Sequence, residues 1–228
     1  MAALVESVNV GRTVEVPWGK LGRSAIDKRP TPAAVHVHGL GLDGDEIADQ
    51  VFHGGPDQAV YAYSREDLAF WEADMGRSIR DGEFGENLTT SGIDLNQARA
   101  GERWRIGGPD GPLLELAGVR IPCSVFGGFV DERRWVRRFT EGCRPGPYFR
   151  VLEEGEVRAG DAIEVVEARS HDVTVELMFQ ALTTERDLLP RLDDEPRIAS
   201  FVARRLGERG PGGRPLDLPP DDGPAAGG

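Results

Sequence analysis

The chain has 228 residues, enough for one domain with an extension, and its 39% hydrophobic and 29% charged residues are ordinary for a globular protein. A net charge of −12 argues against nucleic acids and anionic membranes as partners, because phosphate binding needs clustered Lys and Arg. The first residues lack the pattern of a secretory signal and no run approaches a membrane span, so we expect a cytoplasmic protein.

The first third of the chain is predicted to be rich in strands. Alternating apolar residues indicate strands at 4–10 and 34–38. Between them, residues 22–30 carry three cations, Lys28 among them, in a segment too broken by Gly and Pro to be a helix. Such a segment is typical either of an anion-binding loop or of a solvated turn, and the second is the more common outcome.

A glycine pair precedes the next predicted strand, at 59–63. His53-Gly54-Gly55-Pro56-Asp57 contains two adjacent glycines whose N–H groups can form an anion nest, although a tight turn explains the same residues. A capping box at 64–67 and a stripe formed by Leu68, Trp71 and Met75 predict a helix over 65–75 that ends at Gly76. In the turn that follows, Asn87 is suited to hydrogen-bonding the backbone or a heterocycle.

The centre of the chain continues the strand pattern. Two similar turns introduce predicted strands at 103–106 and 162–165, and with few helices this indicates a barrel with antiparallel connections. A short amphipathic helix is predicted over 131–140. Helical spacing at 175–182 and 197–206 predicts a small helical appendix, and the Gly/Pro/Asp-rich residues from 207 onward are predicted to be disordered.

One of the two cysteines lies where a strand must stop. A predicted strand at 113–117 leads into Gly118-Val119-Arg120-Ile121-Pro122-Cys123, and Pro122 stiffens the backbone so that Cys123 sits at an abrupt exit with Arg120 nearby. A thiol there is well placed to react, whereas the common alternative is a small buried apolar residue. Cys143 lies in a Gly/Pro loop and is interpreted as incidental.

Five short motifs occur in a fixed order along the chain. They are Gly-Leu-Asp-Gly-Asp, His-Gly-Gly-Pro-Asp with Ala-Val-Tyr-Ala-Tyr, Phe-Gly-Glu-Asn-Leu, Arg-Ile-Pro-Cys and Arg-Pro-Gly-Pro-Tyr. Together they resemble the MOSC family, the molybdenum cofactor sulfurase C-terminal domain. The resemblance implies a mainly β protein with a MOSC-type β-barrel at residues 1–170, a few short peripheral helices, a helical extension at 171–206 and a disordered tail at 207–228.

The resemblance also implies a site. It places the family's essential cysteine at Cys123, as a ligand of molybdenum in molybdenum cofactor (molybdopterin) or as the carrier of a persulfide sulfur, because a thiolate suits both roles. Ser124-Val125-Phe126 departs from the aromatic and Lys more usual after this cysteine, which leaves the substrate side of the site undefined. The full set of candidates is Cys123, Arg120 and His53 for catalysis, Lys28, Gly54, Gly55 and Arg65 for the pterin phosphate, and Asn87 for the pterin ring.

The implied function is a molybdenum-dependent oxidoreductase that reduces N-hydroxylated compounds such as hydroxylated bases and amines. Since the sequence has neither a nicotinamide fingerprint nor enough cysteines for a cluster, we expect electrons to come from a separate donor protein. The alternative is a sulfur carrier that receives its sulfur from a pyridoxal-phosphate cysteine desulfurase. A module that only stores the cofactor, or a Cys/His hydrolase, ranks below these two.

Overall fold

In the computed structural model, residues 2–49, 53–193 and 195–207 are described, and the tail predicted to be disordered lies almost wholly outside them. The largest element is an eight-stranded sheet in the order β13-β9-β10-β11-β7-β8-β1-β4. Its strands are β1 (Leu4–Gly11), β4 (Lys28–Pro30), β7 (Val60–Ser64), β8 (Leu88–Ser91), β9 (Arg103–Ile106), β10 (Leu113–Val119), β11 (Pro147–Glu153) and β13 (Ile163–Glu167).

The strand order is that of an open sheet, so the predicted closed barrel is not confirmed. Residues 160–163 nevertheless form backbone hydrogen bonds with residues 3–5, which brings the chain before β13 alongside the start of β1. Neighbouring strands are antiparallel except for β7 and β8, which are parallel because α1 (Arg65–Met75) crosses between them. The expectation of antiparallel connections alone was therefore wrong for this pair.

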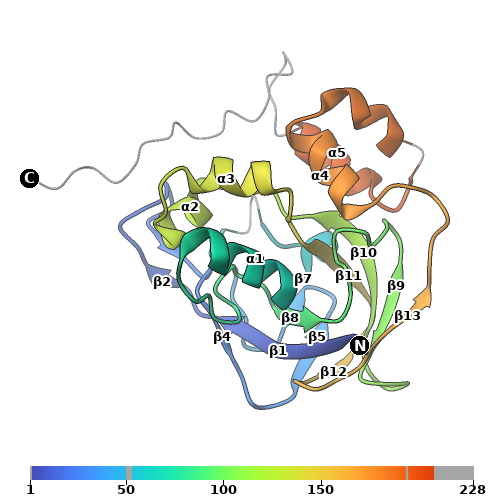
Figure 1. The fold of residues 1–228 in the computed structure, drawn as a ribbon. Helices are drawn as coiled ribbons and strands as arrows, with labels where there is room; N and C mark the ends of the chain where they lie inside the picture. The colour runs from blue at the N-terminus through green and yellow to red at the C-terminus, as the bar shows by residue number, and fades with distance from the viewer. Residues whose placement is uncertain (1, 50–52, 194, 208–228) are drawn as a thin grey trace, which may run out of the picture.

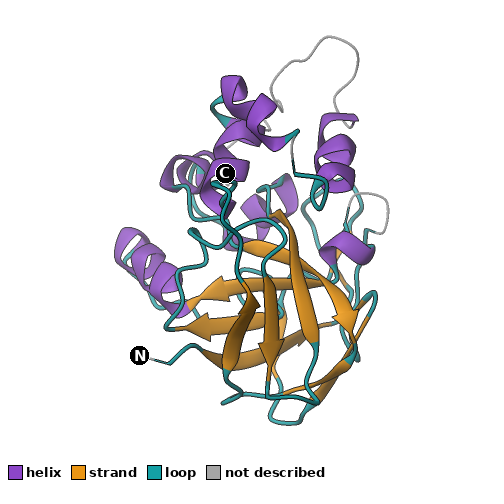
Figure 2. Cartoon of the chain, turned by 90° about the vertical axis from the view of Figure 1, so that its right-hand side faces the viewer, coloured by secondary structure: helices purple, strands orange, loops and turns teal. Residues whose placement is uncertain are grey.

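Two small sheets complete the strands. One has the order β12-β5-β6 and the other joins β2 to β3. Their bounds are β2 (Val14–Glu15), β3 (Arg23–Ser24), β5 (Val35–His38), β6 (Gly41–Leu42) and β12 (Gly155–Val157). Figure 2 shows the strands forming one part of the molecule, while the helices gather at one end and along one side. The structure is therefore a sheet-rich fold with several helices.

The helix α1 agrees with its prediction at both ends. Ser64 caps it by accepting a hydrogen bond from the Asp67 backbone N–H, and Gly76 ends it in the left-handed conformation, with φ of 66°. The other helices are η1 (Pro56–Gln58), α2 (Ser124–Val130), α3 (Trp135–Gly142), α4 (Val175–Thr183), η2 (Arg186–Leu192) and α5 (Ala199–Gly207). None of the described helices has the length and apolar character needed to cross a lipid bilayer.

The helix predicted over 131–140 was placed too early. The structure has α2 at Ser124–Val130, directly after Cys123, and α3 at Trp135–Gly142, with Asp131 and Arg134 in the left-handed conformation between them. Two glycines in α2 lower its intrinsic helix propensity, and packing supplies what propensity lacks. Gly128 lies against the ring of Trp18, so a larger residue would not fit between them.

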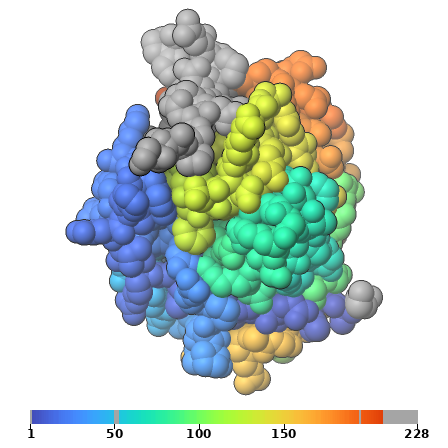
Figure 3. Space-filling model, turned by 60° about the vertical axis from the view of Figure 1, so that its left-hand side comes forward, coloured from blue at the N-terminus to red at the C-terminus, as the bar shows by residue number. Residues whose placement is uncertain are grey.

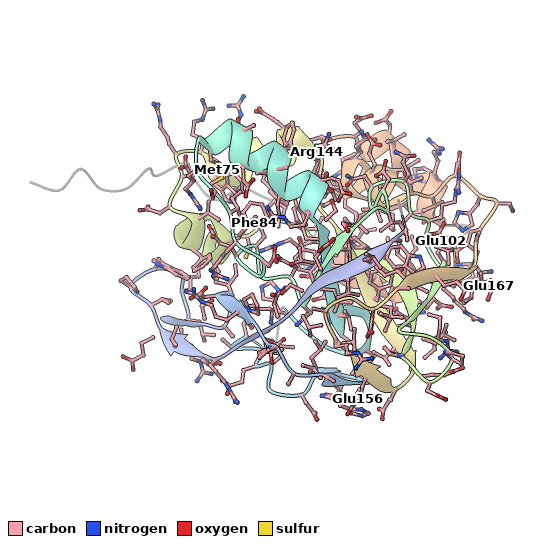
Figure 4. The ribbon with its side chains drawn as sticks, turned by 60° about the horizontal axis from the view of Figure 1, so that its bottom comes forward. Met75, Phe84, Glu102, Arg144, Glu156 and Glu167 are labelled. Atoms are coloured by element: carbon pink, nitrogen blue, oxygen red, sulfur yellow. The ribbon has the colours of Figure 1, made fainter. Side chains whose placement is uncertain are left out.

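An aromatic cluster joins α1, α2 and α3 to the sheet. Trp71 stacks on Phe139 with ring centroids 5.5 Å apart, and Phe84 meets Phe126 edge to face at 5.2 Å. In Figure 4, Phe84 lies beneath α1 and Met75 lies at the end of that helix. The segments of α1 and α2–α3 adjoin on one face of the molecule (Figure 3). The cluster thus fixes the helix that begins beside Cys123.

The C-terminal helices pack on the sheet. In Figure 1, α4 and α5 lie beside the end of the sheet that contains β10 and β11. Phe201 of α5 is buried against Gly118 of β10, where a Cβ atom would approach its ring to 2.6 Å. Because Gly118 lacks a side chain, α5 can lie directly on the strand that leads to Cys123.

Candidate functional site

A cavity opens where β10 ends and α2 begins. Its volume is about 140 Å³, enough for several waters or a small organic group. Its walls come from the N-terminal loops, the glycine pair before β7, and the segment around Cys123. Cys123, Arg120 and His53, the three predicted catalytic residues, all line it, although 67 positions separate Arg120 from His53 in sequence (120 − 53).

Cys123 is half-buried and its surroundings favour the thiolate. Burial by itself raises the pKa of the thiol, but a hydrogen bond with His53, the positive charge of Arg120 and the backbone N–H of Phe126 outweigh this effect and lower the pKa to about 7. A substantial part of the sulfur is therefore anionic at neutral pH. The thiolate is the form of cysteine that acts as a nucleophile and as a metal ligand.

Arg120 is a buried cation beside this thiolate, and the residue is only 7% exposed. Its guanidinium lies 3.8 Å from the centroid of the Phe126 ring and donates a hydrogen bond to the Phe84 carbonyl. Within the described residues its titratable neighbours are the hydroxyls of Tyr61 and Tyr148 and the thiol of Cys123, and no carboxylate pairs with it. Its charge is therefore available to an anion in the cavity.

Lys28 and Asn87 line the same cavity but are engaged with its wall. The Lys28 Nζ atom bonds both carboxylate oxygens of Asp45, with 2.5 Å to Oδ2, and Asn87 Nδ2 donates to the same oxygen at 2.9 Å. Asn87 Oδ1 accepts from the backbone N–H of Tyr61 at 3.1 Å. These two residues hold the N-terminal loops against β7, and their polar groups are largely satisfied by the protein itself.

Gly54 and Gly55 lie at the mouth of the cavity. Gly54 lines the cavity, and Gly55 lines an adjoining recess that shares Gly54 and His53 with it. Both glycines have positive φ, 80° and 83°, a conformation that other residues rarely adopt. The carbonyl of Gly54 accepts hydrogen bonds from both Nη atoms of Arg204 in α5, at 3.4 and 3.3 Å. The helical extension thus contacts the loop that carries His53.

Arg65 is not brought to the cavity. It begins α1, where its guanidinium pairs with Asp81 at 3.0 Å and with Glu72 at 3.1 Å, and it also donates to the Ile79 carbonyl. Arg65 does not appear in the cavity wall, and its charge is balanced by these two carboxylates. Arg65 was a candidate only as a cation within the span of the family resemblance, and its sequence position carries no information about the carboxylates that fold against it.

Several cavity residues were not predicted as site residues from the sequence, Gln58 and Tyr148 among them. Gln58 at the end of η1 and Tyr148 at the start of β11 both line the cavity. Tyr148 ends the Arg-Pro-Gly-Pro-Tyr motif, whereas Gln58 lies between the two halves of the glycine-pair motif, and neither side chain type is distinctive by itself. Among the described residues, no cluster of three or more His, Cys, Asp or Glu side chains could hold a metal ion.

Comparison with known proteins identifies the family. The model of the MOSC domain matches residues 49–164, just over half of the chain. The chain belongs to the MOSC domain family. Members of this family are associated with molybdenum cofactor. The matched region of this MOSC protein includes His53, Arg120 and Cys123, whereas Lys28 precedes it.

Individual relatives agree with this assignment. The chain is 33% identical to the uncharacterized protein YflK of Bacillus subtilis over 75% of this chain and 77% of the relative. It is 31% identical to YiiM of Escherichia coli over 74% of each. A protein of Gibberella moniliformis named Reductase is 31% identical over 86% of this chain, which spans only 35% of that longer protein.

Solved structures show the same fold. The crystal structure of YiiM from Geobacillus stearothermophilus is similar with a TM-score of 0.74 and 25% identity, covering 90% of this chain and 98% of that one. The crystal structure of YiiM from Escherichia coli is similar with a TM-score of 0.66 and 24% identity, covering 92% and 94% of the two chains. The similarity therefore extends beyond the family match and includes the helical extension.

Proposed function

We propose that this MOSC protein binds molybdenum cofactor through Cys123 and reduces N-hydroxylated compounds. The observation that carries the proposal is the thiol of Cys123, whose pKa is lowered to about 7 within a cavity that also contains a buried guanidinium. The fungal relative named Reductase supports a redox role.

The residues in the cavity fit the cofactor. A thiolate available at neutral pH is a soft ligand suited to molybdenum, and Cys123 provides it. Arg120 has no carboxylate partner among the described residues, so its charge can balance an anionic ligand held against Cys123. The N–H groups of Gly54 and Gly55 remain candidates for the cofactor phosphate. Because Lys28 is paired with Asp45 and Arg65 lies elsewhere, neither is proposed here as a phosphate donor.

Each residue of the site has a separate task. Cys123 would hold the metal. The cofactor, when bound, would supply the redox chemistry that removes the hydroxyl oxygen from the substrate nitrogen. His53, through its hydrogen bond to the sulfur, and Arg120, through its charge, would favour the anionic form of Cys123. Ile47 and Val125, both lining the cavity, limit the access of water.

The overall reaction needs an external reductant. An N-hydroxylated amine takes up two electrons and two protons and gives the amine and water, so the nitrogen–oxygen bond breaks and the oxygen leaves as water. We propose a separate electron-donor protein for these electrons. Protons would arrive from solvent at the mouth of the cavity, next to His53.

The test uses three forms of the protein from a host that makes the cofactor: wild type, Cys123→Ser and the matched control Cys143→Ser. Molybdenum is measured by elemental analysis, and the conversion of an N-hydroxylated amine to the amine is measured with reduced methyl viologen as donor. We expect molybdenum and turnover in wild type and Cys143→Ser, with loss of both in Cys123→Ser.

The same samples distinguish the molybdenum enzyme from the alternative function, a sulfur carrier. A metal-free wild-type protein whose intact mass is one sulfur atom heavier, with the extra mass absent from Cys123→Ser, would favour a carrier supplied by a pyridoxal-phosphate cysteine desulfurase. Full molybdenum content and activity in Cys123→Ser would overturn the site assignment itself.

A further inference from the structure

Gln58 is a buried polar residue of the cavity that has no task in the chemistry proposed above. It ends η1, immediately after the glycine pair, and its backbone N–H bonds the Gly55 carbonyl at 3.0 Å. The positive φ angles of the glycines turn the chain so that Gln58 enters the cavity wall together with Cys123 and Arg120. The residue is only 5% exposed.

Both polar atoms of its carboxamide lack a partner. Neither Oε1 nor Nε2 of Gln58 forms a hydrogen bond within the part of the chain that the structure describes. A buried amide that forms no hydrogen bond is unfavourable, and native proteins nearly always pair such groups with protein, water or a ligand. Gln58 therefore presents a donor group, Nε2, and an acceptor, Oε1, that the protein leaves unused.

Other polar groups of the cavity contrast with Gln58. The carboxamide of Asn87 bonds Tyr61 and Asp45, and the hydroxyl of Tyr61 donates to the Pro145 carbonyl at 2.8 Å. These groups satisfy one another and build the wall. Gln58 differs from Asn87, the other carboxamide among the described residues of this cavity, in having no such contact, although the two have similar burial.

The chemistry of a carboxamide limits what it recognises. Its N–H donor and carbonyl acceptor lie side by side, so the complementary group has an acceptor next to an N–H donor, as in a cyclic amide or amidine. A phosphate offers acceptors alone and would leave Oε1 unpaired, and an apolar group would leave both atoms unpaired. The complementary class is therefore a nitrogen heterocycle with an amide or amidine edge.

We propose that Gln58 binds the amide or amidine edge of a nitrogen heterocycle held in the cavity beside Cys123. The inference rests on the proposed function only for the identity of the heterocycle. That heterocycle is either the pyrimidinone ring of the pterin or an N-hydroxylated base bound as substrate. Gln58 is a binding residue on this proposal. Its amide orients the heterocycle, and the chemistry remains at Cys123.

The test compares wild type, Gln58→Leu and the matched control Gln97→Leu, all full-length and purified without cofactor. Gln97 is exposed and bonds Glu176 on the surface, away from the cavity. Equilibrium binding of pterin (2-amino-4-oxopteridine) and of N-hydroxylated adenine is measured by fluorescence or calorimetry. We expect Gln58→Leu to bind at least one probe about tenfold more weakly, since it loses hydrogen bonds to the ring. Gln97→Leu should bind as wild type.

A ligand-side control uses 3-methylpterin, in which the ring N–H is blocked. This probe should bind wild type and Gln58→Leu equally, because the methyl group already prevents the paired contact. Thermal unfolding of the ligand-free proteins provides a readout of structure. Gln58→Leu should unfold at the same temperature as wild type or higher, because an apolar side chain of similar size replaces an unpaired amide.

The binding results show whether Gln58 contacts the cofactor or the substrate. Weaker binding of pterin assigns Gln58 to the cofactor, and weaker binding of the hydroxylated base alone assigns it to the substrate. Unchanged binding of both probes, or no binding of either by wild type, overturns the inference. If Gln58→Leu does not fold, Gln58→Glu retains the size and an acceptor but lacks the donor, and the same loss of affinity is expected.

Failure of this inference is distinguishable from failure of the proposed function. Binding of the two probes needs neither molybdenum nor turnover, so it can succeed even where wild type contains no molybdenum. Conversely, molybdenum lost only in Cys123→Ser, together with unchanged probe binding by Gln58→Leu, leaves the proposed function standing and rejects the role of Gln58.

Discussion

The two cysteines of this chain have opposite surroundings. Cys123 lies beside His53 and Arg120, which lower its pKa to about 7. Burial raises the pKa of Cys143 to about 11, and the nearby carboxylates of Glu176 and Glu185 add to that effect. The same atom type is therefore a reactive thiolate at one position and an inert thiol at the other, and the difference comes from neighbours distant in sequence.

This contrast predicts selective alkylation. Iodoacetamide should modify Cys123 at neutral pH, with a rate that rises as pH passes through about 7, because the thiolate is the nucleophile. Cys143 should remain unmodified until the pH approaches about 11. Peptide mass spectrometry over a pH series measures both rates. Equal labelling of the two cysteines at pH 7 would contradict the assignment.

His53 is expected to set part of this reactivity. Replacing it by Ala removes the hydrogen bond and charge that lower the Cys123 pKa, so the midpoint of the alkylation profile should move to higher pH. His36→Ala is the matched control, since His36 lies near Glu154 in the small sheet, away from the cavity. The proposed contact between His53 and Cys123 fails if both variants retain the wild-type midpoint.

At the scale of elements, the helical extension and the site are linked through β10 and the glycine loop. Phe201 of α5 fills the space above Gly118, and Arg204 of the same helix bonds the Gly54 carbonyl. The sequence predicted α5 from its apolar face and placed its start near 197, yet it did not indicate which element that face packs against. The docking of α5 therefore depends on the absence of a side chain at Gly118.

Gly118→Ala should loosen this contact. The added Cβ atom would lie 2.6 Å from the Phe201 ring, so the ring and α5 must shift, and we expect the unfolding free energy to decrease by about 1–3 kcal/mol. Gly39→Ala is the control, because a Cβ there meets no atom within 4 Å. Urea unfolding measures both variants. If they unfold at the same urea concentration, α5 does not pack on β10 in this way.

Local signals explain why some elements were predicted well. The ends of α1 depend on Ser64 and Gly76, whose capping roles involve residues within one turn, and the sequence therefore predicted both ends. The helix α2 has Gly127 and Gly128 in its centre and no capping side chain, so its local signal is weak. Packing of Phe126 in the aromatic cluster decides its conformation, and that contact is distant in sequence.

For the molecule as a whole, a buried carboxyl group couples stability to pH. Glu86 is fully buried, and its Oε1 accepts hydrogen bonds from the Gly82 N–H at 2.5 Å and from the Thr89 hydroxyl at 3.0 Å. Burial raises the pKa of Glu86 to about 7, and the charge of Asp81 acts in the same direction, although the hydrogen bonds partly oppose it. The folded protein therefore keeps this carboxyl protonated in acid conditions where the unfolded chain would release the proton.

Glu86→Gln should remove this pH dependence. In the unfolded chain the carboxyl has its ordinary pKa of 4.5, so between 4.5 and about 7 the folded state binds more protons and its stability falls as pH rises. Relative to Glu86→Gln, wild type should lose about 3 kcal/mol of unfolding free energy between pH 4.5 and pH 8. Urea unfolding of both proteins across that range is the measurement. A constant difference between them would show that Glu86 keeps its ordinary pKa in the folded protein.

The sequence by itself determined the family and the strand-rich class, and it singled out Cys123 as a candidate for the central residue of the site. These conclusions rest on local patterns: alternation along strands, caps of one helix, and short motifs in a fixed order. Such patterns depend on residues close together in the chain, so they can be read without knowledge of the fold.

Only the tertiary structure decided which polar groups are available to a ligand. Lys28 and Arg65 were both candidates for the pterin phosphate, yet folding pairs the first with Asp45 inside the cavity and the second with carboxylates beside α1. No role was predicted for Gln58 from the sequence, yet folding buries its carboxamide without a partner in the cavity wall. Pairing and burial depend on segments that meet only in the folded chain, and this is the physical reason that sequence patterns did not distinguish these residues.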